Sequence, residues 1–272
     1  MILNNLISLV QEEVEHGHGE EGHGEGAEWI LEHVSDHMVY ELPTVLGIDL
    51  SITFHVLMVW IAAALLIVIF GLGARKVGLV SRGFGSVLES LVIFIRDDVI
   101  FPYLGKDGVR FAPYLLTAFF FILTCNLLGL IPNAGTATGN VSVTATMAVL
   151  TFFVGQGAGM MKKGFLGYWK SFIPPGIPAF VIPILFVAEL MGLFTKHFAL
   201  AIRLFANMVA DHLVVFTFLA LIFIFKNIFV AFIAVPAAAA IELLAVLIAF
   251  IQAYIFTMLS AVFIGIALQE EH

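Results

Sequence analysis

The sequence predicts an all-α membrane protein, and three observations support this fold class. Hydrophobic residues make up 61% of the chain and charged residues only 12%, whereas soluble domains contain roughly 25% charged residues. Long apolar runs without formal charge recur along the chain, and a helical span needs about 20 such residues. The short alternating strands of a membrane β-barrel are absent. The spans are therefore expected to be helices, which satisfy every backbone hydrogen bond within the bilayer.

Residues 1–50 are expected to form an extracytoplasmic acidic tail and an interfacial segment ahead of a membrane domain at 51–272. The tail contains HGHGEEGHGEG from His16 to Gly26. His and Glu can bind metal ions, but glycine-rich spacing holds no geometry, so a solvated, flexible tail is the simpler interpretation. Residues 1–15 lack the basic start and long apolar core of a signal peptide.

The first clear span is Phe54 to Gly73, which contains no formally charged residue. Arg75, Lys76 and Arg82 follow it. Basic residues mark cytoplasmic loops, so the acidic N-terminus is expected outside.

Residues 84–104 differ from the spans because charged residues interrupt the apolar pattern. Leu88, Leu91, Val92 and Ile95 share one helical face, as in helices that lie along a membrane surface. We expect one interfacial amphipathic helix here. The charged residues of this stretch are Glu89, Arg96, Asp97 and Asp98.

Two spans are expected between Phe111 and Met161, a stretch without Asp, Glu, Lys, Arg or His. The turn formers of 132–139 divide it, and Lys162 and Lys163 end it on the cytoplasmic side. The two remaining apolar stretches, 178–225 and 228–268, are both too long for upright spans. The first of them is either two spans or one strongly tilted helix, and Lys226-Asn227 separates the pair.

Ionisable residues inside the 178–268 region are the candidates for function, because charge within a membrane helix usually marks an ion path or proton relay. Arg203 is the strongest candidate, since a guanidinium cannot lose its proton at physiological pH. On a helix, Asn207 lies about 40° from Arg203 and Glu189 about 40° to the other side, whereas His212 is opposite. Glu242 is the only formally charged residue of the last stretch.

A structural role for these charges is the alternative. Arg203 could pair with Asp211 or Glu189 to hold helices together, and buried ion pairs are close to neutral for stability. Lys196 and His197 could extend to the interface or cap a kink.

Four stretches of the chain resemble subunit a of F-type ATP synthases, the membrane stator beside the rotating c-ring. AIRLFANMVADH, which contains Arg203, closely resembles the family's arginine motif. The similarity extends from about residue 50 to the C-terminus. The other three stretches are NLLGLIP at Asn126 to Pro132, NVSVTATMA at Asn140 to Ala148 and FIQAYIFTML at Phe250 to Leu259.

The resemblance implies a fold, a mechanism and a set of residues. It implies five membrane-crossing helices plus the amphipathic one, the last two crossing helices forming a long tilted hairpin beside the rotor. Arg203 matches the arginine that faces the c-ring carboxylate and blocks direct proton leakage between two half-channels. The remaining members of the proposed proton path are Glu189, His212, Glu242, Asn207, Gln252 and Asp211.

The chain departs from the family pattern at several positions. The usual Gly before His212 is Asp211, and the usual Pro after Lys196 is His197. Gly129 replaces a frequent acid, and Glu242 lies about one helical turn further from Gln252 than the family pattern suggests.

We therefore expect the proton-conducting stator subunit of an F-type ATP synthase in a bacterial plasma membrane, with its C-terminus in the cytoplasm. Its expected partners are the c-ring, the peripheral-stalk b subunits, lipid and protons. No cofactor, metal or nucleic acid is expected, and no phosphate-binding loop of the GxxxxGK type occurs. A sodium-driven relative remains an alternative to a proton-driven one, although a titratable His212 favours protons.

Two other classes of protein fit the sequence less well. A secondary transporter would show inverted repeats, and no repeat is visible. An intramembrane hydrolase would need a nucleophile and base held together. His212 and Ser260 are available, but no motif joins them. The single Cys125 lies in an apolar run and is expected to pack rather than react.

Overall fold

The computed structural model describes residues 38–40, 52–75, 83–131, 136–172, 178 and 180–269. The His-rich tail, most of the predicted interfacial segment at 28–50, Lys76 and Arg82 therefore lie outside the described residues. The chain divides into two compact units. Unit 1 includes Val209–Val246 and the strands that precede the first helix, and unit 2 comprises His55–Met208 and Leu247–His272.

The predicted fold class is confirmed. Five helical segments of the described chain are long and apolar enough to cross a membrane, and the last two form a hairpin. One difference is a pair of short strands, β1 (Met38–Tyr40) and β2 (Ile52–Thr53), which pair antiparallel directly before the first helix.

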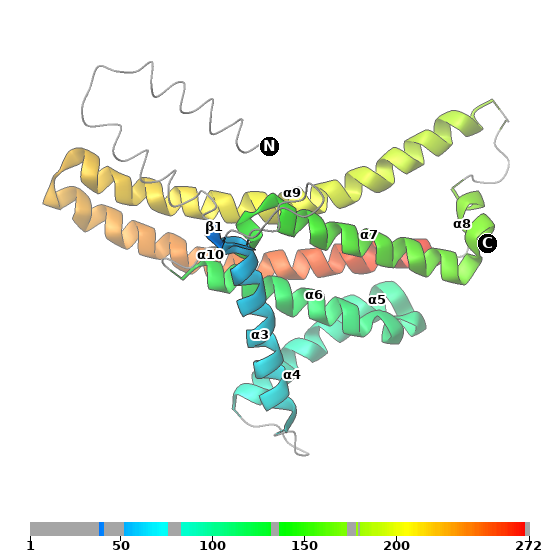
Figure 1. Cartoon of the computed structure of the whole chain (residues 1–272), viewed down its shortest axis with the longest axis horizontal. Helices are drawn as coiled ribbons and strands as arrows, with labels where there is room; N and C mark the ends of the chain where they lie inside the picture. The colour runs from blue at the N-terminus through cyan, green and yellow to red at the C-terminus, as the bar shows by residue number, and fades with distance from the viewer. Residues whose placement is uncertain are drawn as a thin grey trace. The chain divides into compact units, whose positions relative to one another are not determined.

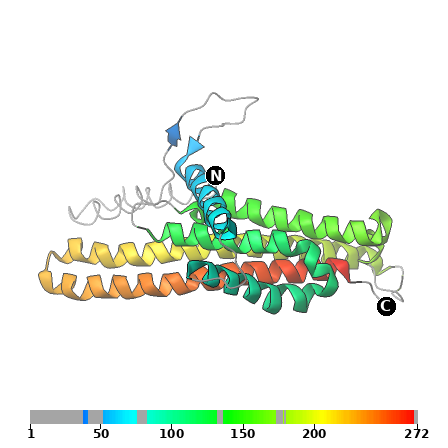
Figure 2. The same ribbon diagram turned by 90° about the horizontal axis from the view of Figure 1, so that it is seen from below.

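Helix α3 (Phe54–Arg75) is the first predicted span, and it crosses the other helices of unit 2 at a steep angle (Figures 1 and 2). The edge of its Phe70 ring meets the Phe120 ring of helix α6 (Gly108–Gly129), with the ring centroids 4.8 Å apart. Side chains on the opposite face of α3 are exposed, and Ile67 is an example at 73% exposure. Such an apolar exposed face suits contact with lipid.

The predicted amphipathic segment is helical, but it is not one uniform α-helix. Helix α4 (Phe84–Ile95) runs into a π-helical turn, η1 (Arg96–Ile100), and then into the short helix α5 (Phe101–Leu104). Pro102 explains the wider turn, because its ring nitrogen cannot donate and its ring crowds the carbonyl four residues earlier. The predicted division of faces is confirmed, since Ile95 is fully buried while Glu89 is exposed.

After a 3₁₀ turn, η2 (Gly105–Asp107), the chain reverses into α6. A second 3₁₀ turn, η3 (Ala137–Gly139), precedes helix α7 (Val141–Lys163). The side chain of Asn140 caps α7 by accepting from the Ser142 amide at 2.8 Å, which stabilises a helix start. The two spans predicted between Phe111 and Met161 are therefore α6 and α7. Helix α8 (Phe165–Lys170) then forms a short turn at the end of α7.

Helices α9 (Ile182–Phe225, 44 residues) and α10 (Ile228–Leu268, 41 residues) make the hairpin. The open question about 178–225 is settled, because the described part of this stretch from Ile182 onward is one continuous helix. At 1.5 Å per residue both helices exceed 60 Å, about twice the bilayer's apolar thickness. Lys226, at φ 45°, makes the turn, and Asn227 accepts from the Phe229 amide at 3.0 Å.

The core of unit 2 lies where α6, α7 and the second half of α10 run side by side (Figures 1 and 2). Phe119 of α6 and Phe256 of α10 are completely buried there. Leu200 and Leu204 bring α9 into the same core, each 1% exposed. These contacts determine which face of α9 is buried in unit 2.

Candidate functional site

Arg203 lies on the exposed face of α9, opposite the side that packs into the core of unit 2. Leu200 and Leu204 are buried, whereas Arg203 is exposed. Its neighbours on the exposed face are small or apolar. They are Ala199, Ile202 and Ala206. Arg203 is therefore a permanent cation whose adjacent residues on the exposed face are small or apolar.

Arg203 has no carboxylate partner among the described residues, where the ion pairs are Arg96–Asp97 and Lys162–Asp107. The alternative in which Arg203 pairs with Glu189 to hold helices together is therefore not what this structure contains. An unpaired charge in a membrane helix is costly, and such residues usually mark functional sites.

One turn beyond Arg203, an amide pair joins the two hairpin helices. The Nδ2 of Asn207 donates to the Oε1 of Gln252 at 2.7 Å. Gln252 is 3% exposed, and its Nε2 finds no hydrogen-bond acceptor among the described residues. The two amides predicted to lie near Arg203 are thus brought together across α9 and α10, and the Nε2 amide nitrogen of Gln252 remains available as a donor.

Asn126 fixes α10 beside this pair. Its Nδ2 donates to the Ala249 carbonyl at 3.4 Å, and its Oδ1 accepts from Thr138 at 2.9 Å. Because Asn126 is 2% exposed, these hydrogen bonds are shielded from solvent. The NLLGLIP stretch therefore positions the helix that carries Gln252.

A second polar feature of unit 2 is a cavity of about 230 Å³ between α7, α8, α9 and the end of α10. Glu189 lines it, together with Lys196 and His197 of the same helix. Within the cavity wall, the Tyr168 hydroxyl donates to Gln156 Oε1 at 2.6 Å and Lys163 Nζ donates to Ser171 Oγ at 3.3 Å. We call this cavity the Glu189 pocket.

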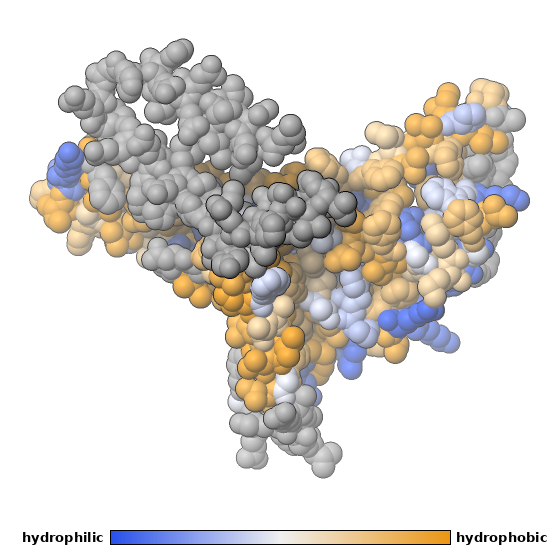
Figure 3. All heavy atoms as spheres, in the orientation of Figure 1, coloured by the Kyte–Doolittle hydropathy of each residue, from blue (hydrophilic) through white to orange (hydrophobic). Residues whose placement is uncertain are grey.

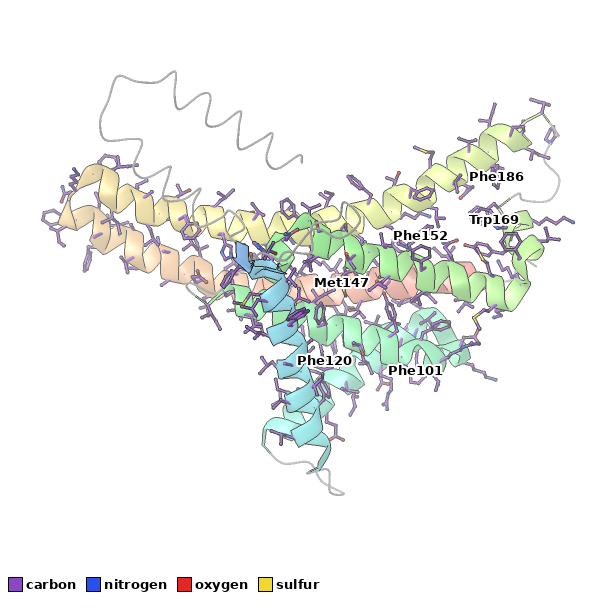
Figure 4. The ribbon with its side chains drawn as sticks, in the orientation of Figure 1. Phe101, Phe120, Met147, Phe152, Trp169 and Phe186 are labelled. Atoms are coloured by element: carbon purple, nitrogen blue, oxygen red, sulfur yellow. The ribbon has the colours of Figure 1, made fainter. Side chains whose placement is uncertain are left out.

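Aromatic contacts join α7 and α8 to α9 near the Glu189 pocket. Phe152 of α7 lies toward α9 (Figure 4), where it stacks on Phe194 with the ring centroids 5.6 Å apart. Trp169 of α8 faces Phe186 of α9 at 6.2 Å. The pocket lining itself combines polar side chains with the apolar side chains of Phe172, Leu193 and Phe263.

His212, Asp211 and Glu242 belong to unit 1, and all three side chains are half-buried. Asp211 and Glu242 are close enough to interact electrostatically. His212 lies against the Phe216 ring, with the ring centroids 6.0 Å apart. No hydrogen bond or ion pair joins His212 to Glu242 in the described part of unit 1. Glu189, by contrast, belongs to unit 2 and lines the Glu189 pocket there.

Gln156 and Tyr168 were not among the site residues predicted from the sequence, and His197 was predicted to have a structural role. Gln156 stands out in retrospect, because it is a bulky amide in a run of Gly, Ala and apolar residues. No metal-binding cluster of three or more His, Cys, Asp or Glu occurs within the described ranges.

Comparison with known proteins identifies the family. The sequence profile of the family described as ATP synthase A chain matches residues 56–265. The chain belongs to the ATP synthase A chain family. A protein named ATP synthase subunit a from Chloroherpeton thalassium is 47% identical over 230 residues, which cover 83% of this chain and 69% of that protein.

Further ATP synthase A chains are equally similar. One from Myxococcus xanthus, named ATP synthase subunit a, is 48% identical over 229 residues, 83% of this chain and 75% of that protein. ATP synthase subunit a 2 from Prosthecochloris aestuarii is 45% identical over 270 residues, 93% of this chain and 83% of that protein. The chain is accordingly a multi-pass membrane protein of the ATP synthase membrane sector, with a role in ion transport and ATP synthesis.

Proposed function

We propose that this chain is the proton-conducting stator subunit that couples proton flow to rotation of a c-ring. The observation that carries the proposal is Arg203, a permanent cation exposed on an apolar helix face without a carboxylate partner in the described chain. A ring of helices that each bring one carboxylate would supply the missing counter-charge. Because Arg203 stays protonated, it attracts the ionised carboxylate and cannot itself relay a proton.

Two separate polar regions support two half-channels. We assign Glu189 and its pocket to the cytoplasmic half-channel, because the pocket is lined by Lys163 and basic residues mark that side. His212, Asp211 and Glu242 of unit 1 are assigned to the opposite half-channel, where protons enter. The proton path expected from the sequence grouped Glu189 with His212 and Glu242, and the pocket supports a separate assignment for Glu189.

The exposed surface supports lipid as a partner of this chain. Unit 2 shows a largely hydrophobic surface, with hydrophilic residues gathered near α8 and η2 (Figure 3). A largely hydrophobic surface is expected where a protein contacts the lipid of a bilayer. We propose a bacterial plasma membrane, an N-terminus outside, a C-terminus in the cytoplasm, and contacts with peripheral-stalk b subunits. Protons are the proposed ion, because the imidazole of His212 can bind and release a proton.

The test is Arg203→Ala in the assembled complex, measured in sealed inverted vesicles. We expect ATP-driven acidification to be lost while the amount of assembled complex stays unchanged, because the counter-charge for the rotor carboxylate is gone. Arg110→Ala is the matched control, since Arg110 is also exposed but lies in the first turn of α6. Retained pumping in Arg203→Ala would overturn the proposed function.

A further inference from the structure

We propose that His197 accepts and returns protons inside the Glu189 pocket, through water held on its Nε2 atom. The inference rests on the proposed function, because it adds a proton-path residue to the half-channel assigned to that pocket. This chain carries His197 where the family usually has a proline, so the residue is a property of this sequence.

The geometry first fixes the tautomer of His197. Its Nδ1 lies 2.9 Å from the Leu193 carbonyl oxygen. A carbonyl oxygen can only accept, so Nδ1 carries the hydrogen and a neutral ring has its lone pair on Nε2.

The Nε2 atom is buried and has no hydrogen-bond partner among the described residues, while the side chain as a whole is 7% exposed. A buried polar atom without a partner is unfavourable, and ordered water is the usual remedy. The pocket that His197 lines has about 230 Å³ of space, enough for several water molecules. His197 lines this cavity, so a small shift of the packed rings would let cavity water reach the unpartnered nitrogen.

The surrounding rings hold the imidazole in place. Phe152 of α7 meets it edge-on with the ring centroids 5.2 Å apart, and Phe263 of α10 lies 5.0 Å away on a tilted plane. The imidazole therefore cannot turn Nδ1 toward the pocket without losing these contacts and its hydrogen bond.

Ionisable groups reach the pocket from three elements. Among the described residues they are Glu189 and Lys196 on α9, Lys163 on α7 and Tyr168 on α8. Helix α10 contributes Phe263, Ile266 and Ala267, and Gln269 follows it, all of them uncharged. Glu189 favours a protonated imidazole and the two lysines oppose it.

The proton balance follows from the fixed hydrogen bond. A proton delivered by water adds to the Nε2 lone pair and gives an imidazolium with both nitrogens protonated. The Nδ1 proton stays bonded to Nδ1 and hydrogen-bonded to the Leu193 carbonyl oxygen, so the proton that leaves must depart from Nε2. His197 thus exchanges protons with the pocket water and Glu189 and does not conduct them through its ring.

The experiment compares His197→Gln and His197→Phe in sealed inverted vesicles, whose medium contacts the cytoplasmic face. Glutamine can hold the water but cannot titrate, and phenylalanine keeps the ring packing without either function. The pumping rate is measured against the pH of the medium. We expect both variants to lose the change in rate between about pH 5 and 8, the range in which a histidine gains or loses its proton. A glutamine variant with the unaltered pH profile would overturn the proposal, even if the phenylalanine variant stopped pumping.

Two further measurements separate the possible failures. Arg203→Ala tests the proposed function independently of His197. Pumping by the Arg203 variant would overturn the proposed stator function, whereas an unaltered pH profile of the His197→Gln variant would overturn only the role of His197. If neither His197 variant assembles, ¹⁵N NMR of the unaltered complex decides. A proton on Nδ1 and an Nε2 resonance that titrates with pH are expected, and a proton on Nε2 in the neutral ring or a signal that does not titrate would overturn the inference.

Discussion

Gly129 shows how a single residue reflects the packing around it. The family often has an acid at this position, and here a glycine ends α6. A Cβ atom added to Gly129 would collide with the Thr136 side chain and lie 2.5 Å from Met208 Cε. The close approach of η3 and α9 therefore leaves no space for a carboxylate side chain.

Gly129→Ala is expected to lower the free energy of unfolding by about 1–3 kcal/mol, the usual cost of overpacking. Gly192→Ala is the matched control, because an added Cβ there meets no atom within 4 Å and alanine favours helices by up to about 1 kcal/mol. Denaturant titration of the purified chain in detergent measures both. Equal stability of the two variants would contradict the packing argument.

At the scale of elements, a buried hydrogen bond links α8 to α7. Tyr168 is 3% exposed and donates to Gln156, which is 6% exposed. Gly159 permits this approach, because an added Cβ would collide with the Tyr168 ring and lie 3.1 Å from the Ala267 carbonyl. The short helix α8 thus closes the Glu189 pocket through a hydrogen bond and a glycine.

Tyr168→Phe is expected to cost about 1–3 kcal/mol of unfolding free energy, because the Gln156 carbonyl oxygen loses its donor while buried. Burial raises the pKa of the Tyr168 phenol, so this contribution is complete at neutral pH and is lost as pH rises above about 10. Tyr254→Phe is the control, since Tyr254 packs on Phe94 and its hydroxyl makes no hydrogen bond within the described chain. Thermal melts at neutral pH in which both variants match the unaltered chain would refute the role of the hydroxyl.

At the scale of the whole molecule, α9 decides the topology. One continuous helix from Ile182 to Phe225 crosses the membrane once, whereas two spans would bring the chain back to its starting side. The basic segment before α9 and the Lys226 turn after it should therefore face opposite sides. This expectation depends on helix continuity and on the positive-inside rule.

Cysteine labelling tests the topology. We expect a membrane-impermeant thiol reagent to label Leu166→Cys from the cytoplasmic side and Lys226→Cys from the opposite side, because both positions are exposed. Cys125 is buried, at 1% exposure, so the unaltered chain should remain unlabelled and serves as the control. Labelling of both cysteines from one side would show that α9 does not cross once.

Much of the fold was predictable because membrane spans are local properties of a sequence. The first span, the charge-free pair α6 and α7, and the break at Lys226-Asn227 all follow from runs of apolar residues and the charges that bound them. Arg203 was also predictable, since a permanent cation in an apolar helix is conspicuous without a structure. The π-helical turn at Arg96–Ile100 was not predicted, although Pro102 supplies its cause.

The sequence by itself determined the fold class, the spans and the candidate arginine, because each depends on residues close together along the chain. Only the tertiary structure decided that Asn207 bonds Gln252, that Arg203 is exposed while Leu204 is buried, and that Glu189 shares a pocket with His197. These facts depend on which helix faces pack together. Packing of α7, α8, α9 and α10 joins residues far apart in sequence, and hydropathy along one helix cannot specify that pairing.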